Sequence, residues 1–506
     1  MAVRDLPHPL LQSRSAGVLL HPTSLPGPDT MGTLGQSAYQ FVDWLAAAGF
    51  GLWQMLPIGP THCNLSPYQT LSVQAGNPEL ISLDDLVARG WLTQTQREHE
   101  KPAVARALAA GQFFTHWEPE SDRVKRFESF CQEHRYWLED YALFDALREC
   151  YGGESWCRWP DDIRLRRTQG LTRMRRELKA PIDVRRFEQF VFFEQWQALR
   201  QYARDKNVFL FGDMPIFVAY DSADVWANQD LFNLDGEGSP LTVAGVPPDY
   251  FSETGQHWGN PHYNWDEMQA QNFRWWRQRF NTQLELFDLI RLDHFRGLEA
   301  YWEIPADHED ASRGRWVKSP GRALLNSLFR EHKNLPLVAE NLGLITPEVE
   351  ALRREFRLPG MVVLQFAFDG STDNPHLPHE HEAHNIVYTG THDNDTSLGW
   401  YQAQPEDVQQ RLRAYCFGSE EPMPRLLVCA ALASVARIAI VPLQDLLILD
   451  GAHRMNTPGT ESGNWRWRFQ WDWFPDTLTS EVRQWLTRYG RLPEVEVQPP
   501  DKPNDD

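Results

Sequence analysis

Eight short apolar runs are spread along the chain, and several of them end in polar residues. They occupy residues 17–20, 51–57, 208–215, 289–297, 335–341, 361–366, 384–393 and 438–445. Helical patterns lie between several of them; Phe41, Val42 and Leu45, for example, share one face of a predicted helix. Strands that alternate with helices pair in parallel, and near-continuous apolar strands suit a sheet covered on both faces. Eight such strands predict an α/β fold, a (β/α)₈ TIM barrel.

The pattern changes from about residue 83 to residue 207, where the chain is charged, aromatic and helical. Ring-bearing side chains recur there at three- and four-residue steps: Phe127, Phe130, His134, Trp137, Tyr141 and Phe144. This spacing predicts a helix with one aromatic face, and Asp183 is placed to N-cap another long helix. We interpret residues 83–207 as a mainly helical insertion in a single catalytic barrel spanning residues 1–506. The tail of residues 494–506, rich in Pro and Asp, is expected to be disordered.

The charge and cysteine content limit the partners and the compartment. The net charge is −20, whereas nucleic acids and anionic membranes require a basic face, so neither is expected as a partner. The most apolar stretch, residues 426–441, contains Arg437 and favours a buried helix and strand over a membrane span. Six cysteines without a C-x-x-C pair argue against a disulfide framework or a zinc site. Together with an N-terminus that lacks a signal-like apolar core, they predict a cytoplasmic protein.

Polar side chains sit at the ends of most of the apolar runs. These are His21, Asp213, Arg291, Asp293, Glu340, His392, Asp393 and Asp445. The carboxyl ends of barrel strands meet at one rim, and barrel enzymes have their active sites there. The repeated placement therefore favours a functional site at this rim over a set of unrelated surface residues.

The run at residues 289–297 shows two possible uses of a charged pair. In a strand, Arg291 and Asp293 share a face, with Ile290 and Leu292 on the other. An arginine beside a carboxylate favours the ionised form of that carboxylate. Taken alone, the pair is more simply a structural salt bridge than a nucleophile with its partner. The other acids at the rim shift the balance towards function.

Three acids, Asp293, Glu340 and Asp393, would converge at this rim. Acid clusters can hold divalent metals, but Arg291 is a poor neighbour for a cation, so we expect no metal and no other cofactor. Cleavage of a sugar–oxygen bond instead uses one ionised and one protonated carboxyl group. Arg291 favours the charged form of Asp293, and the apolar run before Glu340 would raise its pKa by desolvation. Asp393, beside His392, would stabilise positive charge at the anomeric carbon.

Several segments are similar to those of a known enzyme family. They are residues 66–69, 75–78, 212–216, 245–251, 258–261, 290–297, 339–343, 391–396 and 454–459. Three of them read IRLDHFRG, AENLG and THDNDT. Together they resemble the 4-α-glucanotransferases of glycoside hydrolase family 77, also called amylomaltases or disproportionating enzymes. The similarity extends from about residue 17 to residue 468.

The resemblance implies a role for each candidate residue. Asp293 would be the nucleophile, Glu340 the acid/base and Asp393 the stabiliser of the transition state. Substrate contacts would come from Tyr68, Asp213, Asp249, Tyr250, Phe251, Trp258, Arg291, His294 and His392. Tyr68 would form a platform beneath the sugar, and residues 245–261 a lid over the groove. The resemblance also implies α-1,4-glucans as partners, long active-site loops and no C-terminal β-sandwich, but it gives no oligomeric state.

The implied reaction is a retaining transfer of α-1,4-glucan segments to the 4-hydroxyl of an acceptor glucan or glucose. It would pass through a covalent glucosyl-enzyme on Asp293. Retention requires the carboxyl groups of Asp293 and Glu340 to lie about 5–5.5 Å apart. The alternatives are an α-1,4-glucan hydrolase with the same three acids, a metal-dependent barrel enzyme and a non-catalytic glucan-binding protein.

Overall fold

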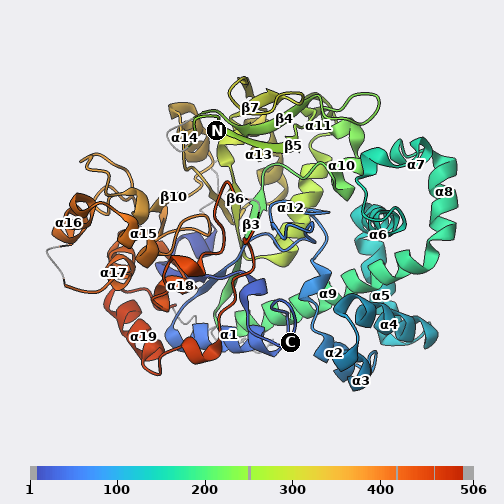
Figure 1. Cartoon of the computed structure of the whole chain (residues 1–506), viewed down its shortest axis with the longest axis horizontal. Coiled ribbons are helices and arrows are strands. Elements are labelled where there is room, and N and C mark those ends of the chain that lie inside the picture. Colours follow the sequence, from blue (N-terminus) through green and yellow to red (C-terminus); the bar gives the residue numbers. More distant parts are fainter. Residues whose placement is uncertain (1–7, 249–251, 417–419, 461, 494–506) are drawn as a thin grey trace, which may run out of the picture.

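The centre of the protein is a barrel of parallel strands (Figure 1). The computed structural model describes residues 8–248, 252–416, 420–460 and 462–493. The barrel strands within these residues are β1 (Ser15–Leu19), β2 (Leu52–Gln54), β3 (Phe209–Pro215), β6 (Leu289–Asp293), β9 (Leu337–Ala339), β10 (Gly360–Val363), β11 (Asn385–Tyr388) and β12 (Ile438–Pro442). They pair in the order β10-β11-β12-β1-β2-β3-β6-β9. The Ala339 N–H donates to the Pro359 carbonyl at 2.9 Å, which brings β9 beside β10. The predicted eight-stranded barrel is confirmed.

Side chains that alternate along each strand separate two cores. In β1, Val18 belongs to the large core between the strands and the surrounding helices, whereas Leu19 belongs to a second core inside the barrel. Phe211, Leu289 and Ile440 also belong to the inner core. The barrel is therefore filled with side chains, and its inward positions near the carboxyl ends of the strands are left for polar residues.

Helices surround the barrel and fill the connections between its strands. The larger ones are α1 (Gln36–Ala48), α12 (Arg274–Leu286), α13 (Gly321–Glu331), α14 (Pro347–Glu355), α16 (Glu406–Tyr415), α17 (Arg425–Ala433) and α19 (Leu478–Arg488). The shorter ones are α10 (Ala223–Ala227), α11 (Trp265–Ala270), α15 (Ser397–Ala403) and α18 (Leu443–Leu446). The apolar stretch at 426–441 forms most of α17 and then β12, as predicted. In the described residues after β12 the structure has helices and turns and no strand.

The region between β2 and β3 projects from one side of the barrel as a group of helices (Figure 1). These are α2 (Leu83–Ala88), α3 (Gln94–His99), α4 (Pro102–Thr115), α5 (Asp122–Glu133), α6 (Arg135–Cys150), α7 (Asp161–Arg164), α8 (Thr168–Glu177) and α9 (Lys179–Asp205). The predicted single aromatic helix is wrong in one respect, because His134 separates α5 from α6. Asp183 is not an N-cap either, because α9 begins at Lys179, and Pro181 is tolerated in its first turn.

A second, antiparallel sheet lies beside the barrel and contains both ends of the predicted lid. Its strands are β4 (Thr242–Val246), β5 (Gln256–Pro261), β7 (Ala300–Pro305) and β8 (Arg315–Lys318), in the order β5-β4-β7-β8. The two ends of the predicted lid loop therefore form a strand pair, β4 and β5, and β4 is also hydrogen-bonded to β7, the strand that follows β6. Asp249, Tyr250 and Phe251 lie outside the described residues.

No helix in the described part of the chain is both long and apolar enough to cross a membrane.

Strand β1 passes so close to β2 that only glycine fits at position 17. A Cβ atom there would lie 2.6 Å from the Leu52 Cβ and 2.8 Å from the Leu52 carbonyl oxygen. We expect Gly17→Ala to destabilise the protein by about 1–3 kcal/mol, the usual cost of forcing extra volume into a packed core. Urea denaturation would measure this. Gly111→Ala is the control, since Gly111 is exposed on helix α4 and a Cβ there meets no atom within 4 Å. Equal stability of the two variants would contradict the close approach.

Candidate active site

The register of β3 and β6 places a carboxylate beside Arg291. Asp213 pairs with Arg291 across the two strands, and both follow inner-core residues at two-residue spacing, so they face the barrel interior. The Arg291 Nε donates to the Asp213 Oδ1 at 3.0 Å, and its Nη2 donates to the Asp213 Oδ2 at 2.9 Å. The same Nη2 donates to the Asp293 Oδ1 at 2.7 Å. The expected shared face of Arg291 and Asp293 is confirmed.

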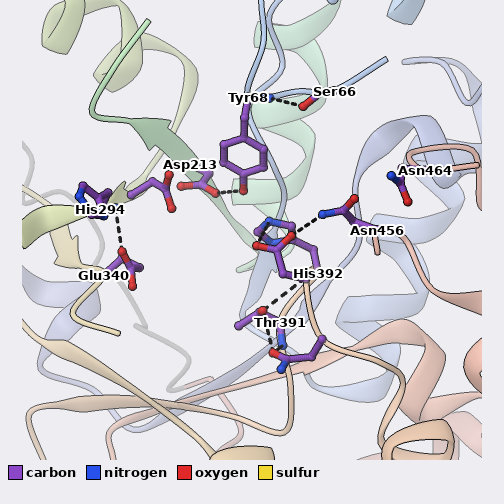
Figure 2. Close-up of polar contacts among 12 residues, drawn as sticks. Ser66, Tyr68, Asp213, His294, Glu340, Thr391, His392, Asn456 and Asn464 are labelled. Carbon is purple, nitrogen blue, oxygen red and sulfur yellow. Dashed lines mark hydrogen bonds and ion pairs between the residues drawn. The ribbon is translucent and has the colours of Figure 1, made fainter. Parts of the chain in front are cut away.

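Tyr68 lies between the charged group of Asp213, Arg291 and Asp293 and the imidazole of His392. Its hydroxyl donates to the Asp213 Oδ2 at 2.6 Å (Figure 2). Its ring stacks on the His392 imidazole, with ring centroids 5.2 Å apart and an angle of 15° between the planes. The stacked rings form an aromatic surface beside the carboxylates, and aromatic ring faces stack on the apolar faces of flat ligands.

Glu340 follows β9 and is held by backbone donors. Its Oε2 accepts the His294 N–H at 2.8 Å (Figure 2), and its Oε1 accepts the Leu342 N–H at 2.8 Å. His294 has a φ of 52°, a left-handed conformation that is costly for a residue with a Cβ. That turn directs the amide next to Asp293 towards Glu340, so the two acids are coupled through one residue of backbone.

Both acids have raised pKa values. Burial raises the pKa of Asp293 to about 7; Arg291 opposes the rise, while Asp213 and Glu340 add to it. Burial also raises the pKa of Glu340, against Arg291 and the two backbone donors. Arg291 therefore favours the ionised form of Asp293, as expected, but burial and two neighbouring carboxylates outweigh its effect, so the pKa of Asp293 is raised. The two acids therefore titrate as a coupled pair, and the ion pair with Arg291 favours the charge on Asp293.

Asp393 lies on the loop that follows β11. Its side chain is 50% exposed, and its Oδ2 lies 3.3 Å from the His392 Nε2. Its Oδ1 accepts a hydrogen bond from the Asn456 Nδ2 at 2.6 Å. Burial acts to raise the pKa of Asp393, but His392, Asn456 and Arg291 together hold it below its ordinary value. This carboxylate therefore stays ionised when Asp293 and Glu340 carry a proton.

His294 and Trp258 form the side of the site next to the second sheet. The rings meet edge to face with centroids 4.9 Å apart, and the Trp258 Nε1 donates to the Gln256 Oε1 at 3.0 Å. Burial lowers the pKa of His294 to about 4, so the ring is neutral at pH 7. Its Nε2 is buried without a hydrogen-bond partner in the structure, which makes it a candidate contact for a bound hydroxyl group.

Two other rim residues, Asp445 and His21, are buried. Asp445 is buried and accepts hydrogen bonds from the Thr389 and Ser397 hydroxyls, both at 2.6 Å. It therefore anchors the two ends of the loop that carries His392 and Asp393. His21 is also buried, and burial lowers its pKa to about 3.

Sequence reasoning missed three residues around Asp393. Asn456 contacts its carboxylate, the Arg454 Nη2 donates to its backbone carbonyl at 2.9 Å, and the Trp465 ring lies 6.0 Å from that of His392. Asn456 and Arg454 belong to the segment 454–459, which was recognised only as similar to a family. Their partner lies about 60 residues earlier in the chain, so spacing alone could not pair them.

The largest cavity among those described is elsewhere. It has a volume of about 630 Å³ and is lined by the starts of strands, including Ser15, Leu52 and Phe209. It is therefore at the opposite end of the barrel from the carboxylates. Among the residues that the structure describes, no three His, Cys, Asp or Glu side chains lie where they could together hold a metal ion.

Comparisons with known proteins agree with this architecture. A family model described as 4-alpha-glucanotransferase matches residues 20–473. The 4-alpha-glucanotransferase of Thermus thermophilus is 48% identical over 472 residues, 90% of this chain and 94% of that protein. The enzyme of the same name from Synechocystis is 44% identical over 500 residues, 95% of this chain and 99% of that protein.

A solved structure, the amylomaltase from Streptococcus agalactiae in complex with acarbose, matches with a TM-score of 0.91 and 35% identity. The match covers 95% of this chain and 100% of that one. The fold and the acidic rim thus define a TIM-barrel enzyme that transfers glucan segments. The chain belongs to the 4-alpha-glucanotransferase family.

The coupled titration of Asp293 and Glu340 predicts how the rate of the first step depends on pH. A nucleophilic Asp293 must be ionised, so the rate of its attack should fall as the pH drops through about 7, the raised pKa. In Glu340→Gln one cause of that rise is removed, so the acid limb should move to lower pH. The measurement is kcat/KM for α-maltosyl fluoride, whose leaving group needs little protonation, between pH 4 and 9. A limb at the same pH in both proteins would contradict the coupling.

Proposed function

We propose that the chain is a retaining 4-α-glucanotransferase in which Asp293 is the nucleophile, Glu340 the acid/base and Asp393 the transition-state stabiliser. The observation that carries the proposal is the different set of donors around each carboxylate. Asp293 accepts from a guanidinium, Glu340 from two backbone amides, and Asp393 from an amide side chain with an imidazole beside it. The three therefore differ in charge state and in exposure, as three separate roles require.

In the first step, the Asp293 carboxylate attacks the anomeric carbon of the donor glucan. The bond to the leaving glycosidic oxygen breaks, and Glu340 gives its proton to that oxygen. Positive charge that develops on the sugar ring faces the ionised Asp393. Arg291 keeps charge on Asp293 before the attack and loses part of its ion-pair partner as the ester forms.

In the second step, Glu340 accepts the proton of an acceptor's 4-hydroxyl as that oxygen displaces Asp293. The product has the α configuration of the donor, because the anomeric centre inverts twice. Transfer rather than hydrolysis requires that sugar fills the acceptor side and that water does not. We propose that the strand pair β4–β5, which carries Trp258, excludes water from the acceptor side.

The substrate classes follow from this chemistry. We propose α-1,4-glucans as donors and acceptors: maltooligosaccharides and the dextrins of starch or glycogen. The unpartnered His294 Nε2, the Tyr68–His392 ring surface and the edge of Trp258 would contact the sugar in the site. A cytoplasmic location is also proposed, because all six cysteines are free thiols, as in a reducing compartment.

Maltotriose distinguishes transfer from hydrolysis. We expect glucose and a ladder of longer glucans with the total of reducing ends constant, because each transfer breaks one glycosidic bond and forms another. Thin-layer or liquid chromatography gives the ladder, and a reducing-sugar assay gives the total. A total that rises as maltotriose disappears would instead support an α-1,4-glucan hydrolase.

Removal of the nucleophile tests the covalent step. Asp293→Asn keeps the shape of the side chain but removes its negative charge, and we expect kcat to fall by at least about ten-thousandfold. In parallel, the parent enzyme treated with 5-fluoro-α-glucosyl fluoride should gain one glycosyl unit on the peptide that contains Asp293, by mass spectrometry. Parent-like activity of Asp293→Asn, or a label on another acid, would contradict the assignment.

A further inference from the structure

Asp393 is restrained on both carboxylate oxygens and on its backbone. The Asn456 Nδ2 donates to its Oδ1 at 2.6 Å, and the His392 Nε2 lies 3.3 Å from its Oδ2. The Arg454 Nη2 donates to its carbonyl oxygen at 2.9 Å, and its own N–H donates to the Thr391 hydroxyl at 3.3 Å. An exposed side chain with this many restraints has lost rotamer freedom that a surface aspartate normally keeps.

Asn456 is itself fixed by the loop to which it belongs. It is buried, and its backbone carbonyl oxygen accepts a hydrogen bond from the Arg454 Nε at 3.1 Å. The Trp465 N–H donates to the Met455 carbonyl at 2.8 Å, and the Thr457 N–H donates to the Asn464 Oδ1 at 2.9 Å, so bonds on both sides of Asn456 close the loop. A carboxylate only accepts hydrogen bonds, so the amide nitrogen of Asn456 must be the end that faces Asp393.

We propose that Asn456 is a positioning residue for Asp393: Asn456 holds the carboxylate of Asp393, and Arg454 holds the backbone carbonyl of the same residue. The pair sets the direction of the Asp393 carboxylate and keeps it ionised while positive charge develops on the sugar. This rests on the proposed role of Asp393. A donor at 2.6 Å would restrict the Asp393 Oδ1 to one direction, and a displacement of about 1 Å at a reacting centre can reduce the rate on the order of a hundredfold.

The charged and titratable groups that face Asp393 come from several elements. His392 lies on the same loop, Arg291 on β6, Tyr68 on the loop after β2 and Arg454 on the loop after α18. All four of these residues are still present in the Asn456 variants. A difference in pH dependence between Asn456 variants therefore reports on the group at position 456 and on Asp393.

The test compares Asn456→Ala and Asn456→Asp with the parent in maltotriose disproportionation. Asn456→Ala should lower kcat about ten- to hundredfold at every pH. Asn456→Asp should lose as much of its kcat at pH 8, where the two adjacent carboxylates repel each other. At pH 5 its kcat should recover towards that of the parent, because one proton shared by the two carboxylates restores a hydrogen-bond donor. Rates are expressed as the ratio to the parent at each pH, which cancels the titration of Asp293 and Glu340.

Two measurements separate positioning from loss of structure. In the Glu340→Gln background, which prevents turnover of maltotriose because its leaving group is not protonated, the Kd for maltotriose by calorimetry should change less than twofold when Asn456 becomes Ala. Asn374→Ala is the matched control, since Asn374 is similarly buried, and its side chain donates to the Phe366 carbonyl at 2.7 Å and accepts from a backbone amide. It should have a lower Tm with an unchanged kcat.

The outcomes distinguish this inference from the proposed function. If Asp393→Asn is as active as the parent, the role assigned to Asp393 is wrong and the positioning role falls with it. If Asp393→Asn is inactive while both Asn456 variants keep parent activity, only the positioning role is wrong. The positioning role is also wrong if the ratio of kcat to that of the parent varies with pH no more for Asn456→Asp than for Asn456→Ala.

Discussion

The site depends on one buried guanidinium with two carboxylates. Arg291 lies in the barrel interior, where a lone charge would be costly, and Asp213 satisfies it with two hydrogen bonds. That pairing leaves the Nη2 able to reach Asp293 as well. Asp213 thus supports the charge that Asp293 uses, and Tyr68 is fixed through the same carboxylate. Replacement of Arg291 or Asp213 by an uncharged residue would leave a buried charge or hydrogen-bond donor without its partner.

The barrel and its loops contribute different properties to the site. Strands β3, β6 and β9 are fixed by ladder hydrogen bonds, so Asp213, Arg291 and Asp293 have positions set by register. Asp393 is on a loop and would be mobile without added restraints. Those restraints are polar side chains from distant segments: Asp445 at the two ends of the loop and Asn456 at its centre. The rigid strands and the restrained loop together give the preorganisation that an electrostatic site requires.

Patterns local in sequence predicted much of this structure. Alternating and apolar runs located the eight strands, and the two-residue spacing of Arg291 and Asp293 predicted their shared face. The strand ends were predicted too long, since the apolar or polar character of a residue does not show where the ladder stops; β11 ends at Tyr388, several residues before His392. The pKa of Asp293 could not be predicted, because it depends on Asp213 and Glu340, which are neighbours only in space. The bond from Asn456 to Asp393 was hidden for the same reason.

The pairing of β1 with β12 has a consequence for how the chain acquires its structure. The first strand of the barrel has the last as one neighbour, and the Arg491 guanidinium donates to carbonyls of Ser15 and of residues around 431–437. During synthesis β1 therefore emerges from the ribosome long before its partner exists. Until then the edge of β1 that will receive β12 has unpaired backbone groups, the kind of edge on which chains associate wrongly. Closure between such distant strands also makes folding slow for a protein of this size.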